Sequence, residues 1–351
     1  MSQKFAAHAA RRVLRLFAIA TSAIAASAVS APAPVRAAEP NVVVTIKPVH
    51  SLVTAIMAGA GTPHLLVDGA ASPHTFTLKP SNAKAIQQAD IFIRVSESLE
   101  PFTRRVVEAL PSKVKLMSLT EAKGVTLLAQ RTGATFEAHA HGGEHDHDAH
   151  DHDDHDHDAA RQKEAGHDEA GHEGGGHGVQ DGHIWLDPKN AQAIVAAVAA
   201  ELAATYPQSA ELFAKNAAEV TAKIDALSSD LQAQLAPVRG KPFIVFHDAT
   251  QYFESRFEIP AAGSVTVTPD AQPSAKRLTE VRKKIASLSA ACVFAEPGFQ
   301  PKLVAAVTDG TSARPGTLDP EGATLTAGPE LYFDLMRNLA KNISTCLAPG
   351  T

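Results

Sequence analysis

The chain has 351 residues, of which 44% are hydrophobic and 20% charged, a balance that suits one large soluble domain or two ordinary lobes. Its formal net charge of −6 argues against a nucleic-acid-binding protein, because phosphate contacts need a basic surface. Aromatic residues make up only 5%, too few for a platform that stacks single-stranded bases. The unusual figure is 17 histidines, 11 of which lie between His139 and His177.

The first 38 residues have the features of a secretory signal peptide. Lysine and arginine residues precede a mostly apolar stretch of 14 residues, Leu16 to Val29, and small residues follow it. That stretch is shorter than the roughly 20 residues that cross a bilayer, and an uncleaved membrane anchor is the alternative interpretation. We therefore predict cleavage after Ala37 or Ala38 and an exported mature chain without a transmembrane segment.

Beyond this leader, short apolar runs alternate with helical stretches, which predicts an α/β fold with mainly parallel sheets and crossover helices. The expected strands are 42–46, 64–67, 91–95, 114–117, 243–246, 264–267 and 292–295. The expected helices are 49–58, 81–88, 99–110, 190–206, 278–288 and 301–307. Between 209 and 235 the chain has 27 residues without glycine or proline, enough for a helix of roughly 40 Å.

These elements predict two lobes joined by one long, rigid helix. The N-terminal lobe is expected at 39–207, the linking helix at 208–236 and the C-terminal lobe at 237–351. A loop at 137–180 interrupts the first lobe, and residues 137–178 hold 11 histidines and 13 acidic residues but one arginine and one lysine. Without large aliphatic residues this loop cannot bury enough surface to offset its ordering entropy, so we predict that it is disordered.

Outside the leader and this loop five histidines remain, and three of them occupy similar places in the pattern. His74 lies in a turn-rich stretch after an expected strand, His183 follows the loop, and His247 ends an apolar run. Ligands in parallel α/β folds gather at the carboxyl ends of strands, and Asp319 follows a further short strand. Three imidazoles and a carboxylate suit Zn²⁺. From spacing alone this set is weak, because a single histidine is more often structural than a ligand.

The two cysteines, Cys292 and Cys346, have no other cysteine near them. In an oxidising compartment they can form one disulfide, which chain-entropy models value at about 4 kcal/mol. Two separate buried thiols are the alternative. Their separation does not suit a cysteine-based metal site.

Five stretches together resemble the zinc-binding periplasmic proteins of bacterial ABC importers, the ZnuA-like family. They are Gly69–Leu78 (GAASPHTFTL), His183–Pro188 (HIWLDP), Val245–Phe253 (VFHDATQYF), Cys292–Pro297 (CVFAEP) and Gly316–Pro320 (GTLDP). The resemblance covers about 41–347, keeps the motif order and includes a His/Asp-rich loop in the family's usual place. It implies two α/β lobes joined by a rigid helix, a metal in the cleft, and a soluble periplasmic monomer. Cys292 and Cys346 match the family's disulfide pair.

Carried over to this chain, the resemblance implies that His74, His183 and His247 bind the metal and that Asp319 occupies the family's carboxylate position. Some members have a glutamate directly before the first ligand, but this chain has Pro73 there. That difference favours Asp319 or a water molecule as the fourth ligand. Manganese-binding relatives carry a carboxylate at the position of His247, so the histidine favours zinc.

The loop histidines are expected to be weak and interchangeable ligands, because nothing holds them in a fixed geometry. Many weak ligands on a tether still give a high local concentration, so we predict a secondary metal-collecting or metal-sensing arm. A solvated acidic tract with incidental histidines is the alternative. The histidines concerned are His139, His141, His145, His147, His150, His152, His155, His157, His167, His172 and His177.

The sequence therefore predicts a solute-binding protein, not an enzyme, that captures Zn²⁺ in the periplasm and delivers it to the permease and ATPase of an ABC importer. An exported zinc reservoir or adhesin without a transporter is the alternative. A zinc hydrolase is a weaker one, since three histidines with an open fourth position also fit catalysis. The sequence offers no motif that places a general base, which disfavours the hydrolase.

Overall fold

The computed structural model describes residues 39–69, 71–131, 136, 179–266, 273–297 and 301–348. The expected signal peptide and the eleven histidines between His139 and His177 lie outside these ranges. Within them, no helix combines the length and the apolar character that a membrane span requires.

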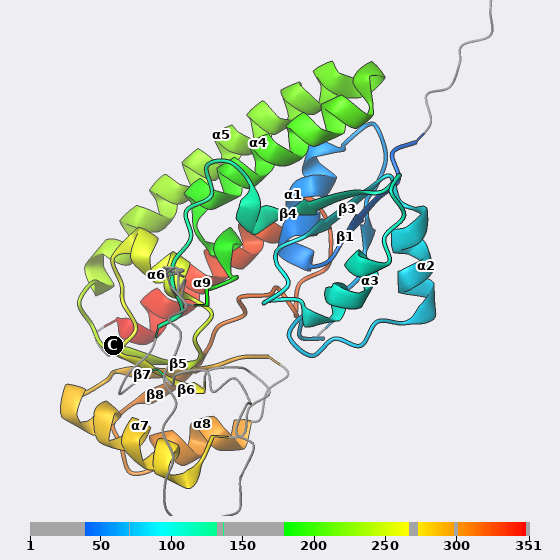
Figure 1. Ribbon diagram of the computed structural model, residues 1–351. Coiled ribbons are helices and arrows are strands. Elements are labelled where there is room, and N and C mark those ends of the chain that lie inside the picture. Colours follow the sequence, from blue (N-terminus) through cyan, green and yellow to red (C-terminus); the bar gives the residue numbers. More distant parts are fainter. Residues whose placement is uncertain are drawn as a thin grey trace, which may run out of the picture. The chain divides into compact units, whose positions relative to one another are not determined.

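The first half of the chain builds a four-stranded parallel sheet in the order β2-β1-β3-β4, and Figure 1 labels β1, β3 and β4. Its strands are β1 (Val42–Val44), β2 (His64–Leu65), β3 (Ile91–Arg94) and β4 (Lys115–Ser118). In β1, Val42 and Val44 face the central core, whereas Val43 faces the side covered by α2 (Pro80–Gln88) and α3 (Arg104–Glu108). Both faces are apolar, as expected for a parallel sheet covered on both sides.

The second half repeats this arrangement with a parallel sheet in the order β6-β5-β7-β8. Its strands are β5 (Phe243–His247), β6 (Gly263–Thr266), β7 (Cys292–Ala295) and β8 (Arg314–Thr317). Ile244 and Phe246 pack with the outer helices α7 (Ala275–Leu288) and α8 (Pro301–Thr308), and the alternate residues of β5 face the central core. The predicted α/β class with two parallel sheets is therefore confirmed.

The remaining helices lie mostly on the inner sides of the two sheets. They are α1 (Lys47–Ile56), α4 (Pro188–Thr205), α5 (Ala210–Leu235), α6 (Gln251–Phe257) and α9 (Leu331–Leu347). Short 3-10 helices cover Pro101–Thr103, Leu119–Glu121, Ile184–Leu186, Pro207–Ser209 and Ala236–Val238. The 26-residue α5 packs along α4 and also contacts α1, α6 and α9 (Figure 1). It corresponds to the long helix that the sequence predicts.

One hydrophobic core is shared by both sheets. Buried side chains from β1 and β3 join those of β5 and β7 in a single cluster, with α1, α4, α5 and α9 between them. The C-terminal α9 packs against α1 in the first half of the chain as well as against α5. Since separating the sheets would expose this apolar surface, at about 25 cal/mol per Å², the core opposes wide hinge motion.

The sequence pattern did not predict α6 or α9. Helix α6 has seven residues, too few to give a clear helical period, and its first three residues belong to the recognised stretch Val245–Phe253. Helix α9 is clearly amphipathic over its 17 residues. It follows a turn-rich segment, and the sequence there was not interpreted as a helix. The expected helix at 99–110 is divided, because Pro101 begins a 3-10 turn before α3 starts at Arg104.

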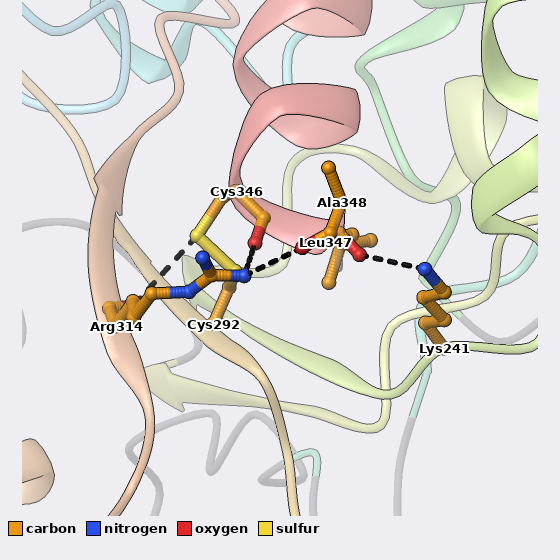
Figure 2. The surroundings of a disulfide bond; sticks show 6 residues. All are labelled: Lys241, Cys292, Arg314, Cys346, Leu347 and Ala348. Carbon is orange, nitrogen blue, oxygen red and sulfur yellow. Dashed lines mark hydrogen bonds between the residues drawn. A yellow bond between two sulfur atoms is a disulfide. The ribbon is translucent and has the colours of Figure 1, made fainter. Parts of the chain in front are cut away.

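The predicted disulfide is present and joins Cys292, at the start of β7, to Cys346 near the end of α9 (Figure 2). Two cations stand at the same helix end. Lys241 donates to the Leu347 carbonyl at 2.8 Å, and Arg314 donates to the carbonyls of Cys346 and Ala348. They satisfy carbonyls left open by the helix and complement its negative dipole end. The disulfide thus fixes α9 to the second sheet.

Candidate metal centre

Three of the predicted ligands converge although they are far apart in sequence. His74 lies in a turn after β2, His183 immediately precedes the 3-10 helix Ile184–Leu186, and His247 is the last residue of β5. The ring centroids are 5.5 Å apart for His74 and His183, 5.8 Å for His74 and His247, and 5.3 Å for His183 and His247. One nitrogen from each ring lies within 4.8 Å of the others. If the rings moved slightly closer together, all three nitrogens could lie 2.0–2.1 Å from a single ion, the usual length of a zinc–imidazole bond.

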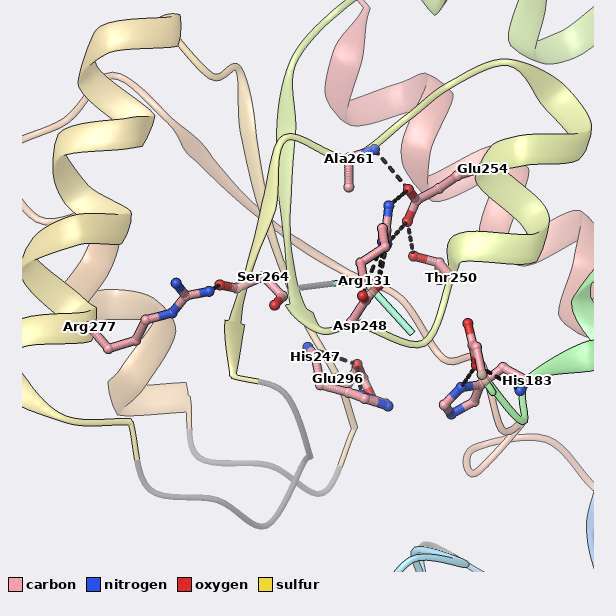
Figure 3. A network of polar contacts seen from close by, with 11 residues as sticks. Arg131, His183, His247, Asp248, Thr250, Glu254, Ala261, Ser264, Arg277 and Glu296 are labelled. Atoms are coloured by element: carbon pink, nitrogen blue, oxygen red, sulfur yellow. Dashed lines mark hydrogen bonds and ion pairs between the residues drawn. The ribbon is translucent and has the colours of Figure 1, made fainter. Parts of the chain in front are cut away.

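Two carboxylates orient the imidazoles of this group. Asp181 Oδ1 lies 2.7 Å from Nδ1 of His183. Glu296 Oε1 lies 2.6 Å from Nδ1 of His247, and this pair is labelled in Figure 3. An ionised carboxylate only accepts, so both Nδ1 atoms carry the proton and both Nε2 atoms present a lone pair. Those two Nε2 atoms are buried and have no hydrogen-bond partner among the described residues. A histidine that donates from Nδ1 to a carboxylate and leaves Nε2 available has the arrangement common to metal-binding histidines.

The site is buried in charged surroundings. His183 is 5% exposed and His247 is 2% exposed, while His74 is half-buried. Burial by itself lowers the pKa of His247, but the charge and hydrogen bond of Glu296, with smaller effects of Asp248 and Asp181, raise it overall. The nearby carboxylates therefore favour a cation at this position, whether a proton or a metal ion.

Local packing accounts for the position of His183. The backbone N–H of His183 also donates to Asp181 Oδ1, at 2.9 Å, which closes a tight turn around the intervening glycine. A Cβ on Gly182 would lie 2.9 Å from the Cβ of Leu99, so no larger residue fits there without a shift. Tyr252 donates to the Asp181 carbonyl at 2.8 Å and ties this turn to α6.

The fourth predicted ligand, Asp319, lies near the three histidines but outside their compact group. It lines a small cavity with His74 and His247. Its Oδ1 accepts from the N–H of Ala323 at 2.8 Å, and its Oδ2 accepts from the N–H and hydroxyl of Thr324 at 2.9 and 2.7 Å. In this structure the carboxylate therefore holds its own turn together. Its role as a metal ligand stays a prediction.

A second acidic residue of this turn, Glu321, lines the same small cavity. Its Oε1 is buried and accepts no hydrogen bond from the described residues. Burial raises the pKa of Glu321 to about 8; neighbouring carboxylates such as Glu296 add to the rise and His183 opposes it. Glu321 directly follows the recognised stretch Gly316–Pro320 and was not among the predicted ligands.

An ion-pair network adjoins His247 (Figure 3). Arg131 donates from Nε to both Oδ atoms of Asp248 at 3.0 Å, and from Nη1 to Glu254 Oε2 at 2.6 Å. Asp248 directly follows His247, while Arg131 is the last described residue of 71–131, at the edge of the His-rich segment. Beside this network a cavity of about 310 Å³ extends along His74 and His183.

The structure thus brings together the three predicted histidines and adds residues that the sequence pattern did not single out. Asp181 and Glu296 each had a signal, since one lies two residues before a predicted ligand and the other follows a strand within a recognised motif. Arg131 had none, because its partners lie 117 and 123 residues away. The eleven histidines of the His-rich segment lie outside the described residues.

Comparison with known proteins gives a match to the family described as "Zinc-uptake complex component A periplasmic" over residues 42–346. The "High-affinity zinc uptake system protein ZnuA" of Brucella suis is 51% identical over 308 residues, which cover 88% of this chain and 92% of that protein. The protein of the same name from Paracoccus denitrificans is 42% identical over 325 residues, covering 92% and 97%.

Solved structures share the fold at lower identity. "Crystal structure of ZnuA" matches with a TM-score of 0.65 at 21% identity and covers 88% of this chain and 98% of that chain. A laminin-binding protein of Streptococcus agalactiae matches with a TM-score of 0.66 at 22% identity, covering 87% and 98%. These likenesses concern the fold alone. Taken with the match over residues 42–346 and the 51% identity to a curated relative, they leave one conclusion: the chain belongs to the ZnuA family of periplasmic zinc-uptake components.

Proposed function

We propose that this protein captures Zn²⁺ in the periplasm and delivers it to the permease of an ABC importer. The observation that carries the proposal is the convergence of three buried or half-buried imidazoles, two of them oriented by carboxylates. Family membership supports the same function, because the curated relatives are named as high-affinity zinc uptake proteins. The family is a transport component, so we assign the site to binding and not to catalysis.

Zinc is the cargo that suits this donor set. Neutral imidazole is a good ligand for a borderline-soft dication, and three of them leave one tetrahedral position. The carboxylates of Asp181 and Glu296 contact Nδ1 of His183 and His247, and their negative charges offset the charge of the ion. We propose His74, His183 and His247 as protein ligands; for the fourth position the sequence alone predicts Asp319 or a water molecule.

The cavity beside the site offers a route for the ion. Its volume of about 310 Å³ is many times the roughly 10–15 Å³ that one water molecule needs on the same measure, so a hydrated ion fits. Asp181 and Asp248 lie along its wall. The histidines between His139 and His177 would act as a secondary collecting or sensing arm that raises the local metal concentration.

Release of the ion would involve small local movements. The shared core and the continuous α5 oppose a wide opening of the two halves. We propose that docking on the permease, whose ATPase drives transport, shifts the turns that carry the ligands. The protein is proposed to act as a soluble periplasmic monomer after removal of residues 1–38.

Calorimetric titration with Zn²⁺ tests the proposal on three proteins: residues 39–351, the same chain without 139–178, and the chain with His247→Ala. We expect one tight site in the first two and several additional weak sites only in the first. His247→Ala should lose the tight site, because a closed zinc site needs its ligand set. If the tight site disappears with 139–178, or survives His247→Ala, the proposed site is wrong.

A further inference from the structure

The turn after β8 places two carboxylates beside the three imidazoles, and they differ in what they already bind. Both oxygens of Asp319 accept hydrogen bonds from their own turn, three in total, from Ala323 and Thr324. Glu321 Oε1, in contrast, is buried without a hydrogen-bond partner among the described residues. A buried acceptor that makes no hydrogen bond costs free energy, and such a group requires a ligand or a function to explain it.

The side chain of Glu321 lies in the metal centre. It lines a small cavity together with His74, His247, Glu296 and Asp319. The cavity has a volume of only about 20 Å³, about one water molecule, so few groups other than an ion or a water molecule can meet this carboxylate.

The backbone of the turn is held firmly from the first half of the chain. Lys47, which is 6% exposed, donates to the carbonyls of Gly322, Ala323 and Leu325 at 3.4, 3.2 and 3.0 Å. Trp185 Nε1 donates to the Pro320 carbonyl at 3.0 Å. Glu321 therefore stands on a fixed support between two anchored peptide groups, and only its side-chain torsions remain to be set by a ligand.

We propose that Glu321 supplies the carboxylate of the zinc site, completing the set of His74, His183 and His247. This inference rests on the proposed function and names the fourth ligand within it. The ligand atoms of the three histidines alone form the compact group, so Glu321 reaches the ion by rotation of its side chain. Asp319 keeps its place as the residue that closes the turn, because binding the ion would break hydrogen bonds that Glu321 does not have to give up.

A carboxylate in the fourth position has two chemical consequences. It cancels one charge of the dication, which favours retention of Zn²⁺ in a buried site. It also excludes the water molecule that an open fourth position would hold, and so removes the nucleophile of a zinc hydrolase. The site would then be a closed binding site, suited to cargo and not to catalysis.

The test compares Glu321→Gln with Asp319→Asn in the chain 39–351. Each change removes one negative charge at nearly constant volume, and both residues belong to one turn. Zinc affinity is measured by competition with a chelator of known affinity, and Co²⁺ is used as a spectroscopic probe of the ligand set. Thermal unfolding of the metal-free proteins reports on the turn itself.

We expect Glu321→Gln to weaken zinc binding by about tenfold or more and to change the Co²⁺ absorption bands, while metal-free stability is retained or increased. Asp319→Asn should mainly lower metal-free stability and leave the Co²⁺ bands unchanged. The proposal is overturned if Asp319→Asn changes the bands and Glu321→Gln does not, or if neither does and water completes the site. His247→Ala distinguishes the proposed fourth ligand from the proposed function. If His247→Ala loses the tight site but Glu321→Gln leaves zinc affinity and the Co²⁺ bands unchanged, only the assignment of Glu321 is rejected.

Discussion

Glu296 accepts a hydrogen bond from Nδ1 of His247 at 2.6 Å, and this contact joins two strands of the second sheet at the metal centre. His247 ends β5, and Glu296 follows the last residue of the neighbouring β7. The pairing turns the Nε2 of His247 away from Glu296, and this buried nitrogen has no hydrogen-bond partner among the described residues. It fixes the tautomer and the ring orientation of His247 and raises the basicity of its Nε2.

Glu296→Ala should therefore weaken zinc binding by about 10- to 100-fold without removing a ligand. Glu296→Gln should cost less, because the amide oxygen can still accept from Nδ1. Competition with a chelator measures both affinities. Glu219→Ala is the matched control, since Glu219 is exposed on α5 and pairs only loosely with Lys215. Unchanged affinity in Glu296→Ala would show that the pairing does not prepare His247.

Lys47 is a buried cation that connects α1 to the turn carrying Asp319 and Glu321. It makes three hydrogen bonds to carbonyls of that turn and a looser ion pair of 3.7 Å with the exposed Asp68. Lys47→Met should lower the free energy of unfolding by about 2 kcal/mol, because hydrogen bonds from a charged donor are lost. It should also accelerate zinc release, since the turn is no longer fixed.

Stopped-flow transfer of zinc to a chromogenic chelator measures the release rate, and urea unfolding measures stability. Lys189→Met provides the control, because Lys189 is an exposed lysine with a surface ion pair whose loss should be nearly neutral. A release rate equal to that of the unchanged chain, despite lower stability, would show that the turn does not control the ion.

The sequence predicted the fold from local periodicity, and it predicted the convergence of His74, His183 and His247 mainly through the family resemblance. In an apolar run such as Phe243–Phe246, both faces of a parallel strand are buried. The local sequence therefore shows where such a strand lies and where it ends. His247 lies at the end of this strand. The sequence pattern did not predict contacts between residues that are far apart in the chain. Lys47 meets carbonyls about 275 residues away, and no local pattern distinguishes it from a surface lysine at a helix start.

Glu100 gives a pH-dependent prediction for the stability of the metal-free protein. It is fully buried, and burial raises its pKa from 4.5 to about 7, although hydrogen bonds from the N–H groups of Ser96 and Val95 and the charge of Arg94 oppose the rise. The folded protein then holds a proton that the unfolded chain releases. The free energy of unfolding should therefore fall as the pH rises from about 4.5 to about 7, by about 3 kcal/mol in total.

Glu100→Gln stays neutral at every pH and should abolish this part of the slope, with a gain in stability over the unchanged chain at pH 8 but not at pH 4.5. Urea unfolding of the metal-free proteins across this range measures it. Glu97→Gln, at an exposed position in the same segment, should keep the slope of the unchanged chain. Parallel pH profiles for Glu100→Gln and the unchanged chain would contradict the prediction.

Arg131 holds two buried carboxylates, one from the residue after His247 and one from α6. Asp248 is 10% exposed and Glu254 is 2% exposed, so removal of the guanidinium leaves two charges without compensation. Arg131→Met should lower the free energy of unfolding by about 3–5 kcal/mol. The triple variant Arg131→Met, Asp248→Asn, Glu254→Gln should recover most of that loss, because it removes the charges together.

The same pair of variants separates stability from metal binding. If the network only stabilises the fold, the triple variant regains both stability and zinc affinity. If Arg131 also fixes the backbone at His247 through Asp248, the triple variant regains stability but still binds zinc more weakly than the unchanged chain. We expect the second result, because the triple variant has no guanidinium and therefore lacks the hydrogen bonds by which Arg131 Nε holds Asp248, the residue after His247.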